Sequence, residues 1–271
     1  MNTSVIALFD LVRKNKPLVH QITNFVTVND CANATLAIGG SPVMTSSPKE
    51  VADMVKLAQA LVLNFGTIDD VSLEAMEIAG KTANDLHIPV IVDPVGVGST
   101  PYRTEKAIEL LDKMTVQVIR GNASEIHRLM GGDIITRGVD SEVLSISNTE
   151  LALLAARKLN SIVVVSGAQD AISDSSRTSI IDNGNPLLTK VTGTGCMATA
   201  LIGVFCGITE DFYSAAIAGI STMSISGELA ARNLKENEGT GTYRTRIIDA
   251  ISTMDQSIWE NEVNIHEEVA L

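Results

Sequence analysis

Aromatic and basic side chains are both scarce in this sequence. Aromatic residues make up 3% of the 271 positions, and 20 basic side chains stand against 32 acidic ones, which gives a net charge of −12. Proteins that mainly bind nucleic acid or an anionic membrane need a basic surface, and single-strand binders also need aromatic platforms for base stacking. We therefore expect neither nucleic acid nor a membrane as a partner.

Cysteine is also scarce, and long apolar runs are absent. The three cysteines are Cys31, Cys196 and Cys206. Their odd number and wide spacing match neither a disulfide framework nor a zinc motif, which indicates a reducing compartment. No apolar run approaches the roughly 18 residues of a membrane span. The N-terminus, MNTSVIALFDLVRKNK, lacks the basic start and apolar core of a signal peptide. We expect a soluble, cytoplasmic protein.

Segments with helical and strand-like spacing alternate along most of the chain. The apolar run IVVV at 162–165 is typical of a parallel strand that is covered on both faces. The alternation predicts a three-layer α/β/α fold with a mostly parallel central sheet and right-handed crossovers. A single domain over 1–271 is the simplest organisation. Strands are expected at 17–22, 42–44, 60–64, 89–92, 116–120 and 161–165, and helices at 3–15, 27–38, 48–57, 69–85, 104–113, 122–130 and 148–159.

The last third of the chain changes character. Two strands, at 171–174 and 177–183, are expected around a serine-rich turn. Helical spacing then predicts helices at 195–206, 210–232 and 242–259. The tail NEVNIHEEVAL is expected to be a frayed, acidic end.

Asp93 ends an apolar strand in the segment VIVDPVGVGS at 90–99. Ligands of open α/β sheets bind beyond the carboxyl ends of the strands. A carboxylate in that position is suited to hold magnesium, directly or through water. The alternative is that Asp93 caps the following turn and that the glycines only shape it.

A second candidate is the segment VIRGNASEI at 118–126, where Arg120 ends a strand. Arg120 is suited to bind phosphate, and Glu125 to orient hydrated magnesium. The alternative is structural, because Asn122 and Glu125 have the spacing of a helix capping box. Ser166, at the end of the strand in VVVSGAQD, is suited to contact a nucleotide, although a simple turn is the alternative.

The stretch KVTGTGCMATAL at 190–201 places Gly193, Thr194 and Gly195 just before a helix. Backbone N–H groups at a helix N-terminus bind anions, and glycine lets the backbone approach a phosphate closely. Cys196 is expected in the first helical turn, where the pKa of a thiol falls. The alternative is a glycine-rich turn beside a buried cysteine. The P-loop, Rossmann and HExxH motifs do not occur in the sequence.

Together these segments resemble the ribokinase-like kinases of small alcohols, and within them the hydroxyethylthiazole kinases. The resemblance covers nearly the whole chain in one register. It is carried by four segments: HQITNFVTVNDCANATLAIGGSPVM at 20–44, VIVDPVGVG at 90–98, RGNASEI at 120–126 and TGTGCMATALIG at 192–203.

The resemblance implies a ribokinase-like fold and the phosphorylation of 4-methyl-5-(2-hydroxyethyl)thiazole by ATP with Mg²⁺, a salvage step of thiamine biosynthesis. It also implies a homotrimer whose active sites lie between subunits. Its motifs assign roles to the following residues: Met44, Gly193 and Asn24 in the thiazole pocket; Arg120, Ser166 and Asn122 in ATP binding; Asp93 and Glu125 in metal binding; and Gly193, Thr194, Gly195 and Cys196 in catalysis.

One departure from the superfamily pattern concerns the general base. Most ribokinase-like enzymes place an aspartate after the Gly-x-Gly loop, and this chain has Cys196 there. We therefore expect a slow enzyme in which Cys196 is a modest base or a positioning group. Two alternatives stay open. One is another ribokinase-like activity, either phosphorylation of a pyrimidine or pyridine alcohol or ATP-dependent repair of a hydrated cofactor, and the other is a non-catalytic binder of thiazole or nucleotide.

Overall fold

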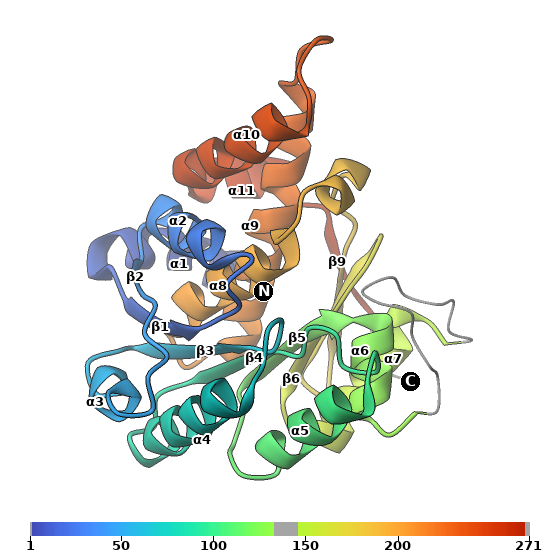
Figure 1. The fold of residues 1–271 in the computed structure, drawn as a ribbon. Coiled ribbons are helices and arrows are strands. Elements are labelled where there is room, and N and C mark those ends of the chain that lie inside the picture. The colour runs from blue at the N-terminus through green and yellow to red at the C-terminus, as the bar shows by residue number, and fades with distance from the viewer. Residues whose placement is uncertain (1, 133–145, 269–271) are drawn as a thin grey trace.

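The computed structural model describes residues 2–132 and 146–268, and within them nine strands form one sheet (Figure 1). The order across the sheet is β2-β1-β3-β4-β5-β6-β7-β8-β9. The strands are β1 (Leu18–Ile22), β2 (Ser41–Val43), β3 (Ala60–Asn64), β4 (Val90–Asp93), β5 (Val118–Asn122), β6 (Ile162–Ser166), β7 (Asp170–Ser173), β8 (Thr178–Ile181) and β9 (Ile265–Glu268).

Helices connect these strands along the chain. Those before β7 are α1 (Asn2–Asn15), α2 (Val28–Ile38), α3 (Val51–Val55), α4 (Asp70–Asp85), α5 (Pro101–Leu111), α6 (Ala123–Leu129) and α7 (Asn148–Leu159). Those after β8 are the 3₁₀ helix η1 (Pro186–Lys190), α8 (Thr194–Cys206), α9 (Phe212–Arg232), α10 (Thr240–Thr253) and α11 (Gln256–Glu262). None of the helices described is both long enough and apolar enough to cross a membrane.

Strands β1 to β6 pair in parallel, and β7, β8 and β9 add an antiparallel extension. The central strands are apolar on both faces because both faces are covered. In β3, Ala60 and Val62 pack into one apolar cluster, whereas Leu61 and Leu63 pack into the other. The first cluster is completed by α1, α2 and α8–α11, and the second by α3–α7, so the two helical layers lie on opposite sides of the sheet (Figure 1). The predicted α/β class and mostly parallel sheet are confirmed.

Two predictions for the C-terminal part are wrong. The helix expected at 242–259 is divided into α10 and α11, because the Asp255 carboxylate accepts a hydrogen bond from the Ile258 N–H and starts a new helix there. The tail expected to fray instead forms β9, which pairs with β8 over Ile265–Glu268. Positions 269–271 of that tail lie outside the described residues.

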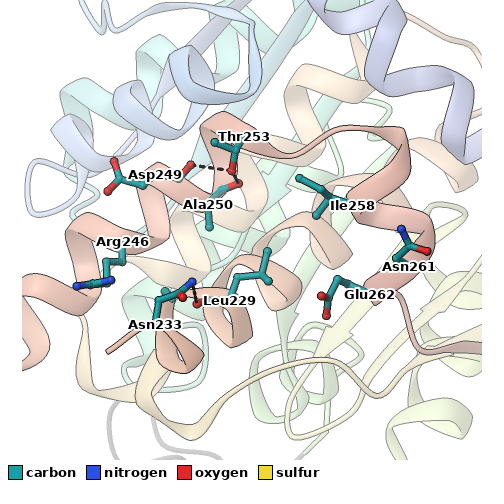
Figure 2. Close-up of a pocket in the computed structure, with 10 residues that line it drawn as sticks. Leu229, Asn233, Arg246, Asp249, Ala250, Thr253, Ile258, Asn261 and Glu262 are labelled. Carbon is teal, nitrogen blue, oxygen red and sulfur yellow. Dashed lines mark hydrogen bonds between the residues drawn. The ribbon is translucent and has the colours of Figure 1, made fainter. Parts of the chain in front are cut away.

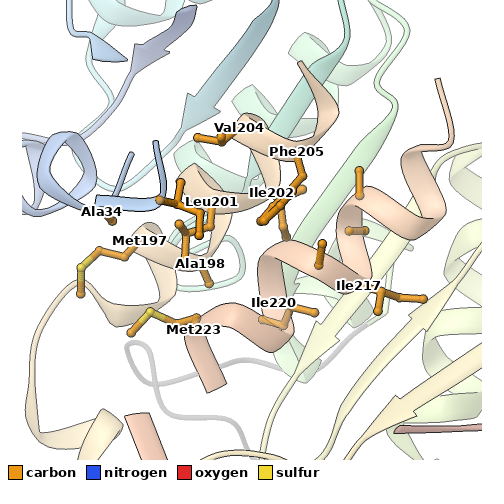
Figure 3. Packing of buried hydrophobic residues seen from close by; sticks show 14 of the residues in the cluster. Ala34, Met197, Ala198, Leu201, Ile202, Val204, Phe205, Ile217, Ile220 and Met223 are labelled. Atoms are coloured by element: carbon orange, nitrogen blue, oxygen red, sulfur yellow. The ribbon is translucent and has the colours of Figure 1, made fainter. Parts of the chain in front are cut away.

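Helices α8 and α9 pack very closely, and glycine makes this possible. A Cβ atom at Gly219 of α9 would lie 2.5 Å from the backbone nitrogen of Ile202 in α8. Figure 3 shows Leu201, Ile202 and Phe205 of α8 against Ile217 and Ile220 of α9. This contact fixes α8, which carries the Gly193–Cys196 loop at its N-terminus.

Replacing Gly219 by alanine is expected to lower the free energy of unfolding by about 1–3 kcal/mol, the usual cost of overpacking a core. Gly241→Ala in α10 is the matched control, because a Cβ at Gly241 would meet no atom within 4 Å. Urea denaturation of both variants measures the difference. Equal stability of the two variants would contradict the close-packing argument.

Candidate active site

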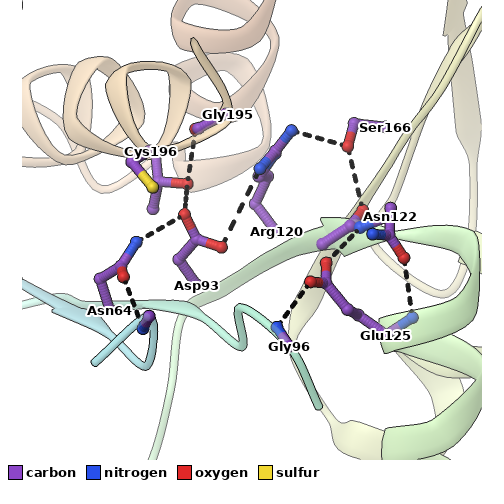
Figure 4. Close-up of polar contacts among 12 residues, drawn as sticks. Asn64, Asp93, Gly96, Arg120, Asn122, Glu125, Ser166, Gly195 and Cys196 are labelled. Atoms are coloured by element: carbon purple, nitrogen blue, oxygen red, sulfur yellow. Dashed lines mark hydrogen bonds and ion pairs between the residues drawn. The ribbon is translucent and has the colours of Figure 1, made fainter. Parts of the chain in front are cut away.

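The carboxyl ends of neighbouring parallel strands bring polar side chains together at one edge of the sheet. Asn24 follows β1, Asn64 ends β3, Asp93 ends β4 and Arg120 lies near the end of β5. Ser166 ends β6, and the N-terminus of α8 lies above these strand ends (Figure 4). The structure therefore brings most of the predicted residues into one cluster.

Asp93 lies at the centre of this cluster and is fully buried. Its Oδ2 atom accepts hydrogen bonds from Asn64 Nδ2 (2.9 Å) and Thr199 Oγ1 (2.8 Å). Its Oδ1 atom is buried without a hydrogen-bond partner among the described residues and lies 3.9 Å from Arg120 Nη1. The partners belong to β3, β5 and α8 rather than to the following turn, so the turn-capping interpretation of this side chain is wrong.

Burial and charge act on Asp93 in opposite directions. Removal from water raises the pKa of Asp93, while the positive charge of Arg120 and the hydrogen bonds from Thr199 and Asn64 lower it. Burial is the larger effect, so the pKa of Asp93 lies above its ordinary value, and the carboxyl group depends on these neighbours to ionise.

Arg120, on β5, contacts both Ser166 at the end of β6 and the Gly193–Cys196 loop. Its Nη2 atom donates a hydrogen bond to Ser166 Oγ at 2.7 Å. A Cβ atom at Gly195 would lie 2.5 Å from Arg120 Nη1, so a side chain there would displace the guanidinium from its present position. The two residues predicted to contact ATP, Arg120 and Ser166, are thus in direct contact, and the cation lies against the predicted anion site.

Asn122 and Glu125 form the capping box that the alternative interpretation predicted. Asn122 Oδ1 accepts from the Glu125 N–H, and Glu125 Oε2 accepts from the Asn122 N–H, both at 2.9 Å. The other carboxylate oxygen, Glu125 Oε1, accepts from the Gly96 N–H at 2.8 Å (Figure 4). Burial, followed by the charge of Asp93, raises the pKa of Glu125 to about 7. Glu125 therefore joins the loop after β4 to the start of α6.

The Gly193–Cys196 loop begins α8 and lies against Thr27. Gly193 has φ +88°, and a Cβ there would be 2.6 Å from Thr27 Cγ2, so both conformation and space require glycine. Thr194 Oγ1 donates to the Leu188 carbonyl at 3.1 Å, which holds the loop from its other side.

Cys196 lies in the first turn of α8, as predicted, but its expected thiolate character is wrong. Burial, and after it the negative charge of Asp93, raise the pKa of Cys196. Both effects outweigh the attraction of a helix N-terminus for a thiolate. The sulfur accepts a hydrogen bond from Asn24 Nδ2 at 3.4 Å.

Met44 lies further from the cluster than the other predicted residues. It directly follows β2, which is three strand positions from β4. At about 4.8 Å between strands, that separation is ~14 Å. Met44 is half-buried. Its predicted contact with a thiazole ring stays a prediction.

The side chains that the structure describes do not form a complete metal site in this cluster. Among residues 2–132 and 146–268, no three His, Cys, Asp or Glu side chains are placed so that they could together hold a metal ion. Mg²⁺ commonly takes one or two carboxylates and completes its octahedron with water and substrate phosphates. The unpartnered Asp93 Oδ1 fits that kind of site.

A separate open cavity of about 430 Å³ lies between α9, α10 and α11 (Figure 2). Its lining comes from the C-terminal helices, with Arg246, Asp249 and Asn261 among the polar residues, and includes none of the strand-end residues. It is therefore distinct from the cluster around Asp93.

Comparison with known proteins identifies the family. The model of the hydroxyethylthiazole kinase family matches residues 9–257. A curated hydroxyethylthiazole kinase from Ruminiclostridium cellulolyticum is 47% identical over 263 residues, which cover 96% of each chain. The chain belongs to the hydroxyethylthiazole kinase family.

Solved structures agree with this assignment. The hydroxyethylthiazole kinase protein from Pyrococcus horikoshii has a TM-score of 0.87 at 35% identity, covering 98% of this chain and 99% of that one. A ribokinase-like superfamily protein from Enterococcus faecalis has a TM-score of 0.63 at 13% identity, covering 90% and 89% of the two chains, and shows the fold alone. The predicted family and the ribokinase-like fold are confirmed.

Three polar residues of this family member were not among the predicted site residues. Asn64 and Thr199 bind Asp93 directly, and the buried Asp170 accepts from the Gly167 N–H (3.0 Å) and Ser224 Oγ (2.9 Å). The signal for Asn64 was available, because it ends an apolar strand as Asp93 does. No comparable signal marks Thr199, which lies within an apolar helical segment.

Asp170 provides a test of the electrostatics beside Ser166. Burial raises its pKa from 3.8 to about 6, so the folded state prefers the protonated form. The resulting stabilisation is present below pH 4 and is lost as the pH rises through 6, by up to about 3 kcal/mol.

In Asp170→Asn, the amide oxygen can still accept from the Gly167 N–H and the amide NH₂ can donate to Ser224 Oγ, so both contacts persist without a charge. Relative to this variant, the free energy of unfolding of the wild type is expected to fall between pH 4 and pH 7. Urea titrations of both proteins at each pH measure the difference. A difference independent of pH would show that Asp170 does not titrate in this range.

Proposed function

We propose that this chain transfers the γ-phosphoryl group of ATP to the hydroxyl of 4-methyl-5-(2-hydroxyethyl)thiazole, a salvage step of thiamine biosynthesis. Membership of the hydroxyethylthiazole kinase family supports the reaction. The observation that carries the proposal is the free Oδ1 of buried Asp93 beside Arg120 and the glycine loop. A metal-binding oxygen, a cation and backbone N–H groups are what phosphoryl transfer requires.

Asp93 would hold Mg²⁺ through Oδ1, and Glu125 would contribute through water or through the Gly96 loop. Both oxygens of Glu125 already accept backbone N–H groups, which favours the indirect role. When bound with the nucleotide, Mg²⁺ neutralises charge on the phosphate oxygens.

Arg120, Ser166 and Asn122 are proposed to bind ATP. The hydrogen bond to Ser166 engages only Nη2 of Arg120, and Nε has no hydrogen-bond partner among the described residues, which leaves donors for a phosphate. The free N–H groups at the start of α8, from Gly193 to Cys196, are proposed to bind the transferring phosphate.

Asn24, Met44 and Gly193 are proposed to line the thiazole pocket, and a second subunit is proposed to complete it. Phe25 and Val26, next to Asn24, have exposed fractions of 78% and 57%, which is unusual for apolar side chains beside a buried cluster. A homotrimer with active sites between subunits would cover Phe25 and Val26.

If the protein is a homotrimer, sedimentation equilibrium should give a mass three times the 28.7 kDa of one chain. We also propose that the enzyme works in the cytoplasm.

The two alternative functions are not favoured. The family assignment separates this chain from other ribokinase-like kinases of pyrimidine or pyridine alcohols. A non-catalytic binder would not need a fully buried carboxyl group with one oxygen facing a cation, which Asp93 has here beside Arg120.

The wild-type protein is expected to release ADP from ATP and Mg²⁺ only when the thiazole alcohol is present. A coupled ADP assay measures this, with a pyridine alcohol as the comparison substrate. Absence of turnover in folded protein would contradict the kinase proposal, and faster turnover of the comparison substrate would favour the alternative kinase.

Cys196→Asp is expected to retain or increase kcat. The carboxylate would accept the hydrogen bond that Asn24 Nδ2 now donates to the sulfur, and a general base is typically worth ~10²–10⁴-fold. Cys196→Ala serves as the control without a titratable group. A steep fall of kcat in folded Cys196→Asp would refute the role of Cys196 as a weak substitute for a base.

A further inference from the structure

A row of buried side-chain amides joins Cys196 to Asp93. Asn24 Nδ2 donates to both Cys196 Sγ (3.4 Å) and Asn64 Oδ1 (2.9 Å), and Asn64 Nδ2 donates to Asp93 Oδ2 (2.9 Å). Asn24 and Asn64 are 4% and 2% exposed. The row runs from the segment after β1 to the ends of β3 and β4. Figure 4 shows its Asn64 and Asp93 below the start of α8, where Cys196 lies.

The direction of every bond in this row is fixed. Asn64 Oδ1 also accepts from the Gly66 N–H at 2.9 Å, and a backbone N–H can only donate. The amide oxygen of Asn64 must therefore face Gly66 and Asn24, which turns its NH₂ group toward Asp93.

Thr199 acts on the same oxygen of Asp93 from the opposite side. Its hydroxyl lies 2.8 Å from Asp93 Oδ2 and 3.3 Å from the Gly195 carbonyl, and its single proton goes to the closer, charged acceptor. Two donors thus converge on Oδ2, whereas no described residue donates a hydrogen bond to Oδ1, which lies 3.9 Å from Arg120 Nη1.

We propose that Asn64 is a positioning residue for catalysis: together with Thr199 it occupies Asp93 Oδ2, so that Oδ1 alone is presented to the magnesium–nucleotide complex. The Asn64 amide also orients Asn24, which donates to Cys196. It thereby links Asp93, the carboxylate that would face the metal, to Cys196, the residue beside the reacting hydroxyl. This inference rests on the proposed kinase function.

The competing explanation is that Asn64 only satisfies buried hydrogen-bonding groups. Under that explanation, its replacement lowers stability but leaves the metal-dependent part of nucleotide binding intact. Under our proposal, the carboxylate can rotate once a donor is lost, and magnesium-dependent binding weakens even in a folded variant.

Two variants remove one donor each. Asn64→Asp keeps the acceptor for Gly66 and Asn24 but replaces the donor to Asp93 by an acceptor. Thr199→Val removes the other donor without adding charge, and Thr199→Ser restores a hydroxyl. Asn84→Asp is the matched control, because Asn84 pairs with the backbone of Thr115 in a loop outside the cluster.

Calorimetry measures the affinity for ADP with Mg²⁺ and with EDTA, and steady-state kinetics measures kcat and KM. Loss of an orienting partner of a metal ligand typically costs about 10- to 100-fold. For Asn64→Asp and Thr199→Val we expect a loss of this size in kcat and in the affinity for ADP with Mg²⁺. The affinity for ADP with EDTA and the KM for the thiazole should change little. Thr199→Ser and Asn84→Asp should resemble the wild type.

Equal losses in the two arms, or no loss in folded Asn64→Asp and Thr199→Val, would overturn the inference. A loss in Asn84→Asp of the same size would show a general structural defect and would also overturn it. If Asn64→Asp does not fold, Thr199→Val decides alone. Because the calorimetry needs no turnover, it tests the inference even if wild-type protein fails to phosphorylate the thiazole.

Discussion

The buried carboxylate of Asp93 is the constraint on which the proposed site depends. Removing a charge from water is expensive unless hydrogen bonds and an opposite charge compensate. Asp93 receives this compensation from three elements that are distant in sequence: Asn64 on β3, Arg120 on β5 and Thr199 on α8. The strand order places β3 and β5 on either side of β4, and the close contact of α8 with α9 brings Thr199 down onto Asp93. The fold thus supplies compensation that no local sequence could.

The glycine positions follow from the same arrangement. The absence of a side chain at residue 195 leaves space for the Arg120 guanidinium beside Asp93, and Thr27 can pack on the loop only because residue 193 has none. The glycine loop therefore serves two purposes. It brings backbone N–H groups to the place proposed for phosphate, and it admits the arginine that neutralises the charge of Asp93. A side chain at either position would disturb both.

Prediction from the sequence succeeded where local signals are strong. Asp93, Arg120 and Ser166 are polar residues near the ends of apolar strands, and parallel strands of one sheet must bring such ends together. The capping box at Asn122 and Glu125 is local too. Thr199 was missed because its partner lies 106 positions away, and β9 was missed because its pairing with β8 is also non-local. The raised pKa of Cys196 was missed for a related reason: the first turn of a helix favours a thiolate, but burial and the charge of Asp93 depend on the tertiary fold.

That raised pKa bears on how the reaction can proceed. A thiol that stays protonated near neutral pH cannot take up the proton of a substrate hydroxyl at the outset. In a loose transition state, bond formation to the nucleophile lags behind loss of the leaving group, so the hydroxyl needs little deprotonation before transfer. The arrangement around Asp93 suits such a reaction. The groups that are held most firmly there position charge, and they are not groups that accept protons. Cys196 is also held in place by a hydrogen bond, which its sulfur accepts from Asn24 Nδ2. We therefore propose that Cys196 contributes mainly by alignment, and that the lack of a strong base lowers the rate without preventing the transfer.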